Sequence, residues 1–365
     1  MSLDGKVAVV TGSGRGLGLA YACELARRGA SIVVNDVDKE LADQAVATVL
    51  AAASEAGWDL GTETSEPAGA PRAVAVVAPV GPTATAQELV RTAVETFGRL
   101  DILVTNAGVL RDAVLWKMSD DDFDTVVDVH LRGTFTCVRE AAIRFREQGD
   151  GGRIICIGSP TGQRGNFGQT SYAAVKAGIV GMVRTWAMEL ARAKVTVNAV
   201  VPVAATAMTD SVPLFKQLAD AAAGGAETSG AEAQGAEDRG ADLRSYARRT
   251  LGFGTPDDAA GIVAYLASDA AADVTGQAIG VGGDRLALWT HPTEAAVAFT
   301  DGGWSADALA EGFGAVFGGV LQTVGQELPA PPEHSAPQAD STPAADTAER
   351  QPARTPEHGA ESRAS

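Results

Sequence analysis

Two kinds of residue are scarce in this 365-residue sequence, cysteines and basic residues. The three cysteines, Cys23, Cys137 and Cys156, stand far apart and without metal-ligand spacing. This argues against a disulfide framework or a metal site, and it favours a reduced compartment in which the thiols are small buried hydrophobes. Only 29 Lys and Arg residues oppose 46 Asp and Glu, so the formal net charge is −17. That balance argues against nucleic acid or an anionic membrane as a partner.

Long apolar runs are also missing. No stretch is long enough to span a bilayer, and the chain enters a strand pattern at once, without a basic region followed by an apolar one. We therefore expect no signal peptide, no membrane partner and a cytoplasmic location. What the sequence does contain is 45% hydrophobic residues and 42 glycines, which is typical of a soluble α/β protein with many tight turns.

Short β-branched runs alternate with helical patterns along most of the chain. Strands are predicted at residues 6–10, 31–35, 73–78, 101–105, 153–157, 195–201 and 277–281, and helices lie between them. This alternation predicts an α/β fold, a doubly wound parallel sheet of about seven strands with helices on both faces. We expect it to form one domain over residues 1–284.

Three segments break the alternation. Residues 54–72 and 220–242 are rich in Gly, Ala, Glu and Thr and are predicted to be flexible insertions, and residues 328–365 are predicted to be a disordered tail. Residues 285–327 hold too many apolar side chains for a free tail. We expect this C-terminal extension to pack on the domain or on a partner subunit.

A glycine-rich turn, T-G-S-G-R-G-L-G at 11–18, follows the first strand and opens a helix. A glycine cluster alone is weak evidence, but strand, glycine turn and helix together predict a phosphate cradle at a helix N-terminus. Asp36 ends the next strand, where a carboxylate accepts hydrogen bonds from ribose hydroxyls and repels a 2′-phosphate. Asp36 therefore favours NAD over NADP, although Arg15 could pair with a 2′-phosphate and Asp36 could simply start a turn.

Tyr172 and Lys176 are four residues apart, so on a helix they lie on the same face. Ser159 follows a predicted strand thirteen residues before the tyrosine. A hydroxyl facing a phenol and an ammonium is a plausible acid/base site, and the ammonium is expected to lower the pKa of the phenol. An incidental Tyr and Lys on a surface helix is the alternative. His130, alone in an apolar helix, is by default a structural residue.

The carboxyl ends of parallel strands share one edge of a sheet, where ligands bind. The glycine turn, Asp36, the small residues N-A-G at 106–108, and Ser159 all fall at such ends. We therefore expect them to line one site.

Together these motifs resemble the short-chain dehydrogenase/reductases over about residues 4–284. Within this family the chain is similar to one group in two further motifs, V-H-L-R-G at 129–133 and G-N-F-G-Q at 165–169. That group includes the (3R)-hydroxyacyl-CoA dehydrogenases of multifunctional enzymes and bacterial hydroxysteroid dehydrogenases. The resemblance implies a Rossmann-type fold and an oligomer, a homodimer or homotetramer.

The resemblance also implies roles for individual residues. Tyr172 is the general acid/base, Lys176 lowers its pKa and binds the nicotinamide ribose, and Ser159 polarises the substrate oxygen. His130 stands where the family usually has an asparagine, so its catalytic role is open. The residues implied in cofactor binding are Gly12, Gly14, Arg15, Gly16, Leu17, Gly18, Asp36, Val80, Asn106, Ala107, Gly108, Tyr172, Lys176 and Thr206. No metal is implied.

The expected function is oxidoreduction of a secondary alcohol and ketone with NAD or NADP, NAD being favoured. A 3-hydroxyacyl-CoA or a hydroxysteroid is the expected substrate. One alternative is an NADPH-dependent 3-oxoacyl or polyketide ketoreductase. Another is a non-catalytic dinucleotide-binding or assembly protein, against which the presence of Ser159, Tyr172 and Lys176 argues.

Overall fold

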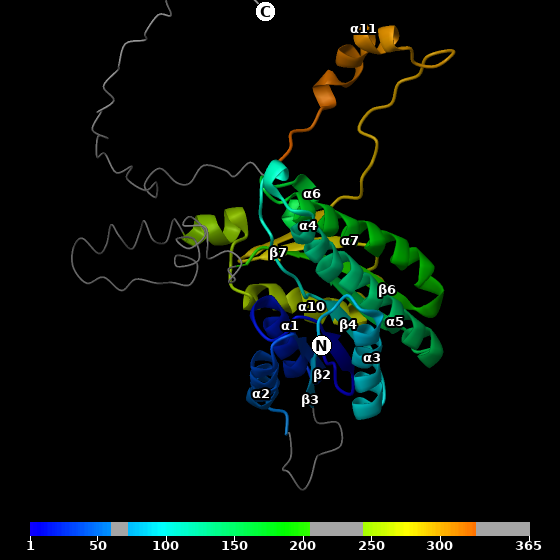
Figure 1. The fold of residues 1–365 in the computed structure, drawn as a ribbon. Coiled ribbons are helices and arrows are strands. Elements are labelled where there is room, and N and C mark those ends of the chain that lie inside the picture. Colours follow the sequence, from blue (N-terminus) through cyan, green and yellow to red (C-terminus); the bar gives the residue numbers. More distant parts are fainter. Residues whose placement is uncertain (60–71, 205–243, 326–365) are drawn as a thin grey trace, which may run out of the picture.

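The structure is a computed structural model that describes residues 1–59, 72–204 and 244–325 (Figure 1). The predicted insertion at 220–242, the predicted tail and Thr206 lie outside the described residues, as does most of the predicted insertion at 54–72.

An eight-stranded sheet forms the centre of the molecule, in the order β3-β2-β1-β4-β5-β6-β7-β8. The first seven strands are parallel, as predicted, and β8 pairs antiparallel with β7. Their bounds are β1 Val7–Val10, β2 Ser31–Asp36, β3 Ala73–Val77, β4 Ile102–Thr105, β5 Gly152–Ile157, β6 Val195–Pro202, β7 Ala278–Gly282 and β8 Arg285–Trp289. The strand order reverses between β1 and β4, so a crevice for ligands is expected at the carboxyl ends of these strands.

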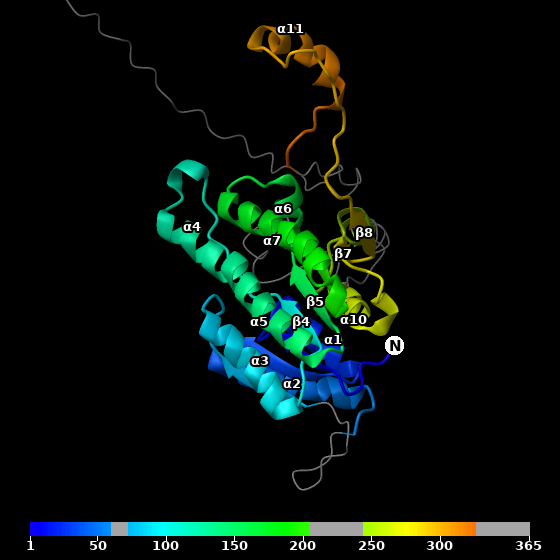
Figure 2. The same ribbon diagram turned by 90° about the vertical axis from the view of Figure 1, so that its right-hand side faces the viewer.

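Helices cover both faces of the sheet (Figure 2). On one face lie α1 (Gly16–Arg27), α2 (Lys39–Glu55) and α10 (Ala260–Ala267). On the other lie α3 (Thr83–Phe97), α5 (Gly133–Gln148) and α7 (Thr170–Glu189). Each inner strand is buried on both faces: in β1, Ala8 and Val10 join the first apolar cluster and Val7 and Val9 join the second. The Rossmann-type architecture expected from the sequence is thus confirmed.

The helical region between β4 and β5 is interrupted. The Ser119 hydroxyl accepts a hydrogen bond from the Asp122 amide and caps α4 (Asp120–Val126). A π-helical turn, Val127–Arg132, then separates α4 from α5 and contains His130. A short helix that the sequence did not suggest, α6 (Pro160–Arg164), follows β5 directly.

Other short elements connect the main ones. They are 3₁₀ helices at Leu115–Lys117, Ala191–Ala193, Asp257–Ala259, Asp269–Ala271 and Gly318–Val320, and a second π-helical turn at Tyr246–Leu251.

The C-terminal extension divides into two parts. Strand β8 pairs with β7 through a Gly283–Asp284 hairpin turn, and Arg164 of α6 lies over the ring of Trp289, 5.0 Å from its centre. From there the chain leaves the body, forms α11 (Ala306–Phe317) and returns to α6, where the Gly325 amide donates to the Arg164 carbonyl (Figures 1 and 2). No residue of α11 is buried in the described structure. Within the described residues the extension therefore packs on the domain through β8, with further hydrogen bonds from His291 to the Gly276 carbonyl and from Gly325 to the Arg164 carbonyl.

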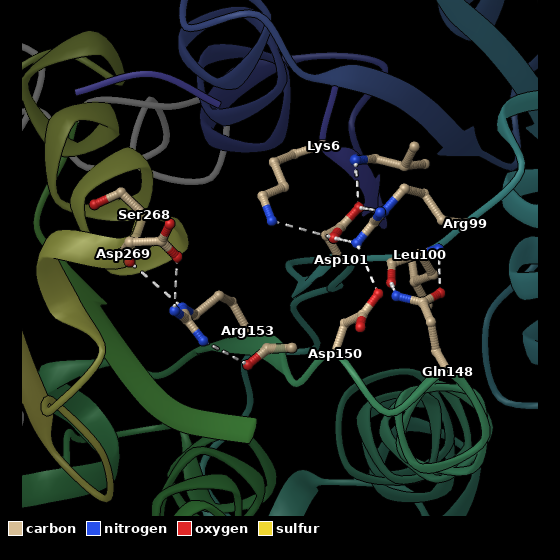
Figure 3. A network of polar contacts seen from close by, with 11 residues as sticks. Lys6, Arg99, Leu100, Asp101, Gln148, Asp150, Arg153, Ser268 and Asp269 are labelled. Carbon is tan, nitrogen blue, oxygen red and sulfur yellow. Dashed lines mark hydrogen bonds and ion pairs between the residues drawn. The ribbon is translucent and has the colours of Figure 1, made fainter. Parts of the chain in front are cut away.

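At the amino end of the sheet, charged side chains form a paired network (Figure 3). The Asp101 carboxylate accepts hydrogen bonds from the Val7 amide and from two nitrogens of Arg99, and it lies 3.6 Å from the Lys6 ammonium. This ties the start of β1 to the start of β4. At the start of β5, the Arg153 guanidinium forms an ion pair with the Asp269 carboxylate at 3.1 Å. Asp269 lies on the segment after α10.

Candidate active site

The glycine turn connects β1 to α1 and packs closely on the neighbouring loop. Gly12 has a φ of +61°, and a Cβ there would lie 2.6 Å from the Cα of Ala107. The Asn106 side chain donates to the carbonyls of Thr11 and Gly12, while the Thr11 hydroxyl accepts from the amides of Asn106 and Ala107. Asn106 and Ala107 therefore hold the turn in place. The packing of the turn on this loop requires glycine at position 12.

No side chain caps the N-terminus of α1, because Arg15 at the N-cap makes no capping hydrogen bond. The amides of the first turn can then bind an anionic group. The uncapped helix end follows a turn whose close packing leaves no room for a Cβ at Gly12. This arrangement fits the pyrophosphate of a dinucleotide. Gly16, Leu17 and Gly18 form its first turn, as the sequence predicted.

Asp36 is the last residue of β2, and its carboxylate bends over the glycine turn. One oxygen accepts from the Gly14 amide at 3.1 Å and the other from the Asp38 amide at 3.2 Å. A Cβ on Gly14 would lie 2.5 Å from the carboxylate oxygen, so a larger residue here would displace the Asp36 side chain. Val80 lies after β3 and packs against Gly133 of α5, at the same edge of the sheet.

Ser159 lies between β5 and α6 and is 8% exposed. It caps α6, since its Oγ accepts a hydrogen bond from the Thr161 amide at 3.2 Å. Helix α6 packs tightly on α7 at Gly162, where a Cβ would lie 2.6 Å from the Ala177 amide nitrogen. This contact brings Ser159 next to Tyr172. The Ser159 hydroxyl also forms a side-chain hydrogen bond with the Tyr172 phenol.

Tyr172 and Lys176 lie one turn apart on α7, and the Lys176 ammonium is 5.5 Å from the centre of the tyrosine ring. Lys176 is 3% exposed and donates to the Ile157 carbonyl at 2.7 Å. His130 approaches from the π-helical turn, and its ring meets the Tyr172 ring edge-on with 5.3 Å between centres. The four residues predicted as catalytic therefore lie together at the carboxyl end of β5.

Burial controls the proton affinities in this group. It lowers the pKa of Lys176 to about 7, and it raises the pKa of the Tyr172 phenol. The hydrogen bond from Ser159 lowers the phenol pKa, while the charge of Asp112 raises it further. The phenol pKa thus lies above its ordinary value, whereas the sequence predicted a lowered one, because desolvation by burial is the largest cause of its shift.

Two loops in front of Tyr172 are joined by a polar network that the sequence did not reveal. The Gln169 side chain donates to Asp112 at 2.9 Å and accepts from Thr161 at 3.1 Å and from Asn166 at 3.0 Å. The Ala113 amide also donates to the Gly168 carbonyl. Gln169 thus links the loop after β4 to the helix that Ser159 caps. The motif G-N-F-G-Q contains it, but nothing in the sequence identifies its partners.

In the described ranges, no group of three His, Cys, Asp or Glu side chains is arranged to hold a metal ion. None of the helices there is both long and apolar enough to cross a membrane.

The family model for short chain dehydrogenases matches residues 6–216. The chain is 42% identical over 209 residues to peroxisomal multifunctional enzyme type 2 of Drosophila melanogaster, covering 57% of this chain but only 33% of that enzyme. It is 38% identical over 298 residues to hydroxyacyl-CoA dehydrogenase ChsB1 of Mycobacterium tuberculosis, covering 80% of this chain and 81% of the relative. It is 35% identical over 286 residues to 3-oxoacyl-[acyl-carrier-protein] reductase FabG of Thermotoga maritima, covering 78% and 98%.

Among solved structures, a short chain dehydrogenase from Mycobacterium avium is similar, with a TM-score of 0.68 and 30% identity, over 89% of this chain and 98% of that one. The mostly parallel sheet with helices on both faces agrees with these matches. The chain therefore belongs to the short-chain dehydrogenase family of oxidoreductases.

Proposed function

We propose that this chain interconverts a secondary alcohol and a ketone with NAD, acting on a 3-hydroxyacyl-CoA or a hydroxysteroid. The observation that carries the proposal is the grouping of Ser159, Tyr172 and Lys176 beside the glycine turn and Asp36. The relatives named as a hydroxyacyl-CoA dehydrogenase and as a multifunctional enzyme support the first substrate class.

Each side chain has a role that follows from its surroundings. Ser159, which hydrogen-bonds the Tyr172 phenol in the described structure, donates its hydroxyl hydrogen to the substrate oxygen when that oxygen binds beside both side chains. Tyr172, whose raised pKa keeps the phenol protonated, gives its proton to a ketone oxygen during reduction. For oxidation the phenol must first lose that proton, and the Lys176 charge then stabilises the phenolate. The bound nicotinamide supplies or accepts the hydride.

Asp36 supports NAD as the cofactor. Its carboxylate is fixed by the Gly14 amide at the edge where an adenosine ribose is expected, and a 2′-phosphate there would meet a like charge. Arg15 beside it is the observation that favours the alternative, an NADPH-dependent 3-oxoacyl reductase like the Thermotoga relative. Of the two side chains, only the Asp36 carboxylate is held in place by hydrogen bonds in the described structure.

A substrate panel tests the proposal. Purified protein with NAD should generate reduced-nicotinamide absorbance from 3-hydroxyacyl-CoAs or hydroxysteroids, and NADP should be the poorer cofactor. Dinucleotide binding is measured separately by calorimetry. Preference for NADP across the panel would overturn the Asp36 argument, and binding without turnover on any substrate would favour the non-catalytic alternative.

We also propose that α11 packs on a second copy of the chain. A twelve-residue helix with no buried residue gains little stability alone in water, and members of this family commonly form oligomers. Sedimentation velocity should show an oligomer that Phe313→Asp weakens. Leu286→Asp is the control, because this apolar side chain is also exposed but lies on β8. A monomeric full-length chain would contradict the proposal.

A further inference from the structure

Helix α6 has Ser159 at its N-cap, yet it is too short to be stable by itself. It spans only Pro160–Arg164, and isolated helices of fewer than about 12 residues are marginal in water. The Ser159 Oγ accepts a hydrogen bond from the Thr161 amide, so the position of this hydroxyl depends on the first turn of α6. The contacts that hold α6 in place therefore also hold Ser159.

Two neighbours support α6, the helix α7 and the side chain of Trp289. The α7 contact is at Gly162, where a Cβ would lie 2.6 Å from the Ala177 amide nitrogen. Trp289 is the last residue of β8, and the Arg164 guanidinium lies over its ring, 5.0 Å from the centre. Arg164 is the last residue of α6, so this contact holds the end of the helix opposite to Ser159.

The indole of Trp289 fills the space between α6 and the sheet. It is partly buried and packs on the apolar cluster of the α7 face. Gly280 of β7 faces it, since a Cβ there would lie 3.2 Å from the indole nitrogen. Pro160, the residue after Ser159, lines with Trp289 and Gly280 a cavity of only about 20 Å³, which is room for a single water. A small side chain at position 289 would enlarge this cavity and leave the start of α6 without support.

The backbone of the C-terminal extension contacts α6 as well. After α11 the chain returns to the body, and the Gly325 amide donates to the Arg164 carbonyl at 2.8 Å (Figure 2). Two separate parts of the extension, β8 and the segment at Gly325, thus contact the helix that Ser159 caps. Both lie beyond residues 6–216, which the family model matches.

We propose that Trp289 is a positioning residue, which fixes α6 on the sheet and thereby places the Ser159 hydroxyl for the substrate oxygen. Its indole lines the cavity beside Pro160 and lies under Arg164, so a shift of α6 would lose one of these contacts. The inference rests on the proposed function, in which Ser159 donates to the substrate oxygen. It gives β8, an edge strand remote from the cofactor turn, a part in catalysis.

Two substitutions at Trp289 and one control test this role. Trp289→Ala removes the indole, whereas Trp289→Phe keeps an aromatic ring for Arg164. Trp58→Ala is the matched control, because Trp58 is also partly buried but packs on the other apolar cluster and donates to the Arg27 carbonyl at the end of α1. Both alanine variants should lower the urea midpoint of unfolding, since both remove a packed indole.

Only Trp289→Ala should lower kcat, by about 10-fold, within the roughly 10²-fold that a misplacement of about 1 Å costs. Its dinucleotide Kd should not change, and Trp289→Phe should retain most of the rate. In a Ser159→Ala background, Trp289→Ala should change kcat by less than about twofold, because the group that it positions is gone. Equal kcat losses in Trp289→Ala and Trp58→Ala, or losses at 289 and 159 that multiply, would overturn the proposal.

Hydrogen exchange keeps this inference distinct from the proposed function, because it needs no substrate. Within α6 and its cap, the Gly162 amide donates to the Ser159 carbonyl and the Gly165 amide to the Thr161 carbonyl. In the full-length protein these two amides should exchange faster in Trp289→Ala than in the wild type, and at the wild-type rate in Trp58→Ala. Unchanged exchange in Trp289→Ala would overturn the inference, whereas faster exchange in a protein that turns over no substrate of the panel would contradict the proposed function alone.

Discussion

The two ends of the sheet differ in whether their buried polar groups have partners. At the amino end, Asp101 is nearly buried and is paired with Arg99, Lys6 and the Val7 amide (Figure 3). Gln148 nearby exchanges hydrogen bonds with both backbone groups of Leu100. Every polar side chain of this network has a partner, so the network joins β1, β4 and α5.

At the carboxyl end, the buried groups are left partly uncompensated. Lys176 is buried, and no carboxylate of the described residues forms an ion pair with it. The His130 Nδ1 has no partner there, and the pKa of Tyr172 is raised by burial. Such groups cost folding free energy. The difference indicates that one end stabilises the fold, while the other holds shifted proton affinities that serve chemistry.

Removing the phenol should have the largest effect. Tyr172→Phe should lower kcat by about 10³-fold or more, within the range that a general acid/base contributes, while dinucleotide binding changes little. Steady-state kinetics and calorimetry measure the two effects. Tyr265→Phe is the control, because that tyrosine lies on α10 and is 36% exposed. A Tyr172→Phe variant that keeps a tenth of the rate would mean that another group moves the proton.

The amino end should show the reverse pattern. Asp101→Asn removes the charge that Arg99 and Lys6 share and puts an amide N–H group against donors, so we expect a loss of about 2 kcal/mol in unfolding free energy. Urea denaturation measures it, and kcat/KM should not change. Asp43→Asn breaks an exposed pair with Lys39 and should cost less than about 0.5 kcal/mol. Equal losses in the two variants would show that the network adds no stability.

The fold was predictable because its signals are local. Buried strands such as Val7–Val10 are short β-branched runs, and the alternation with helices leaves few arrangements of the sheet. The same rule predicted that the glycine turn, Asp36 and Ser159 share one edge. β8 was missed, although the Gly283–Asp284 pair between two apolar runs is a hairpin signal.

Other parts of the site depend on contacts that spacing does not encode. The π-helical turn that presents His130 continues a helical pattern in the sequence, and only the structure shows its altered hydrogen bonds. Asp112 and Thr161, two partners of the Gln169 side chain, lie 57 and 8 residues away in the sequence, in a loop and in α6. The direction of the Tyr172 pKa shift was wrongly predicted, because the depth of burial that decides it is a property of the packed fold.

The last expected effect is a pH dependence, and it concerns the stability cost of the catalytic end. Lys176→Met replaces the buried amine with an uncharged side chain. The folded-state pKa of Lys176, about 7, lies below the ordinary value of 10.5, so between these values the unfolded chain binds more protons than the folded one. The wild-type protein should therefore gain stability as pH rises from about 7 towards 10, by at most about 1.4 kcal/mol per pH unit. The variant lacks this gain.

Urea denaturation of the wild type and of Lys176→Met at pH 6 and pH 9 measures the difference. The variant should compare more favourably with the wild type at pH 6, where the wild-type amine is charged and buried, than at pH 9. Lys39→Met is the control, because that lysine is 74% exposed, and its difference from wild type should not depend on pH in this range. If the Lys176→Met difference is also independent of pH, the ammonium is compensated in the folded chain. The two ends of the sheet would then not differ in how far their buried charges are compensated.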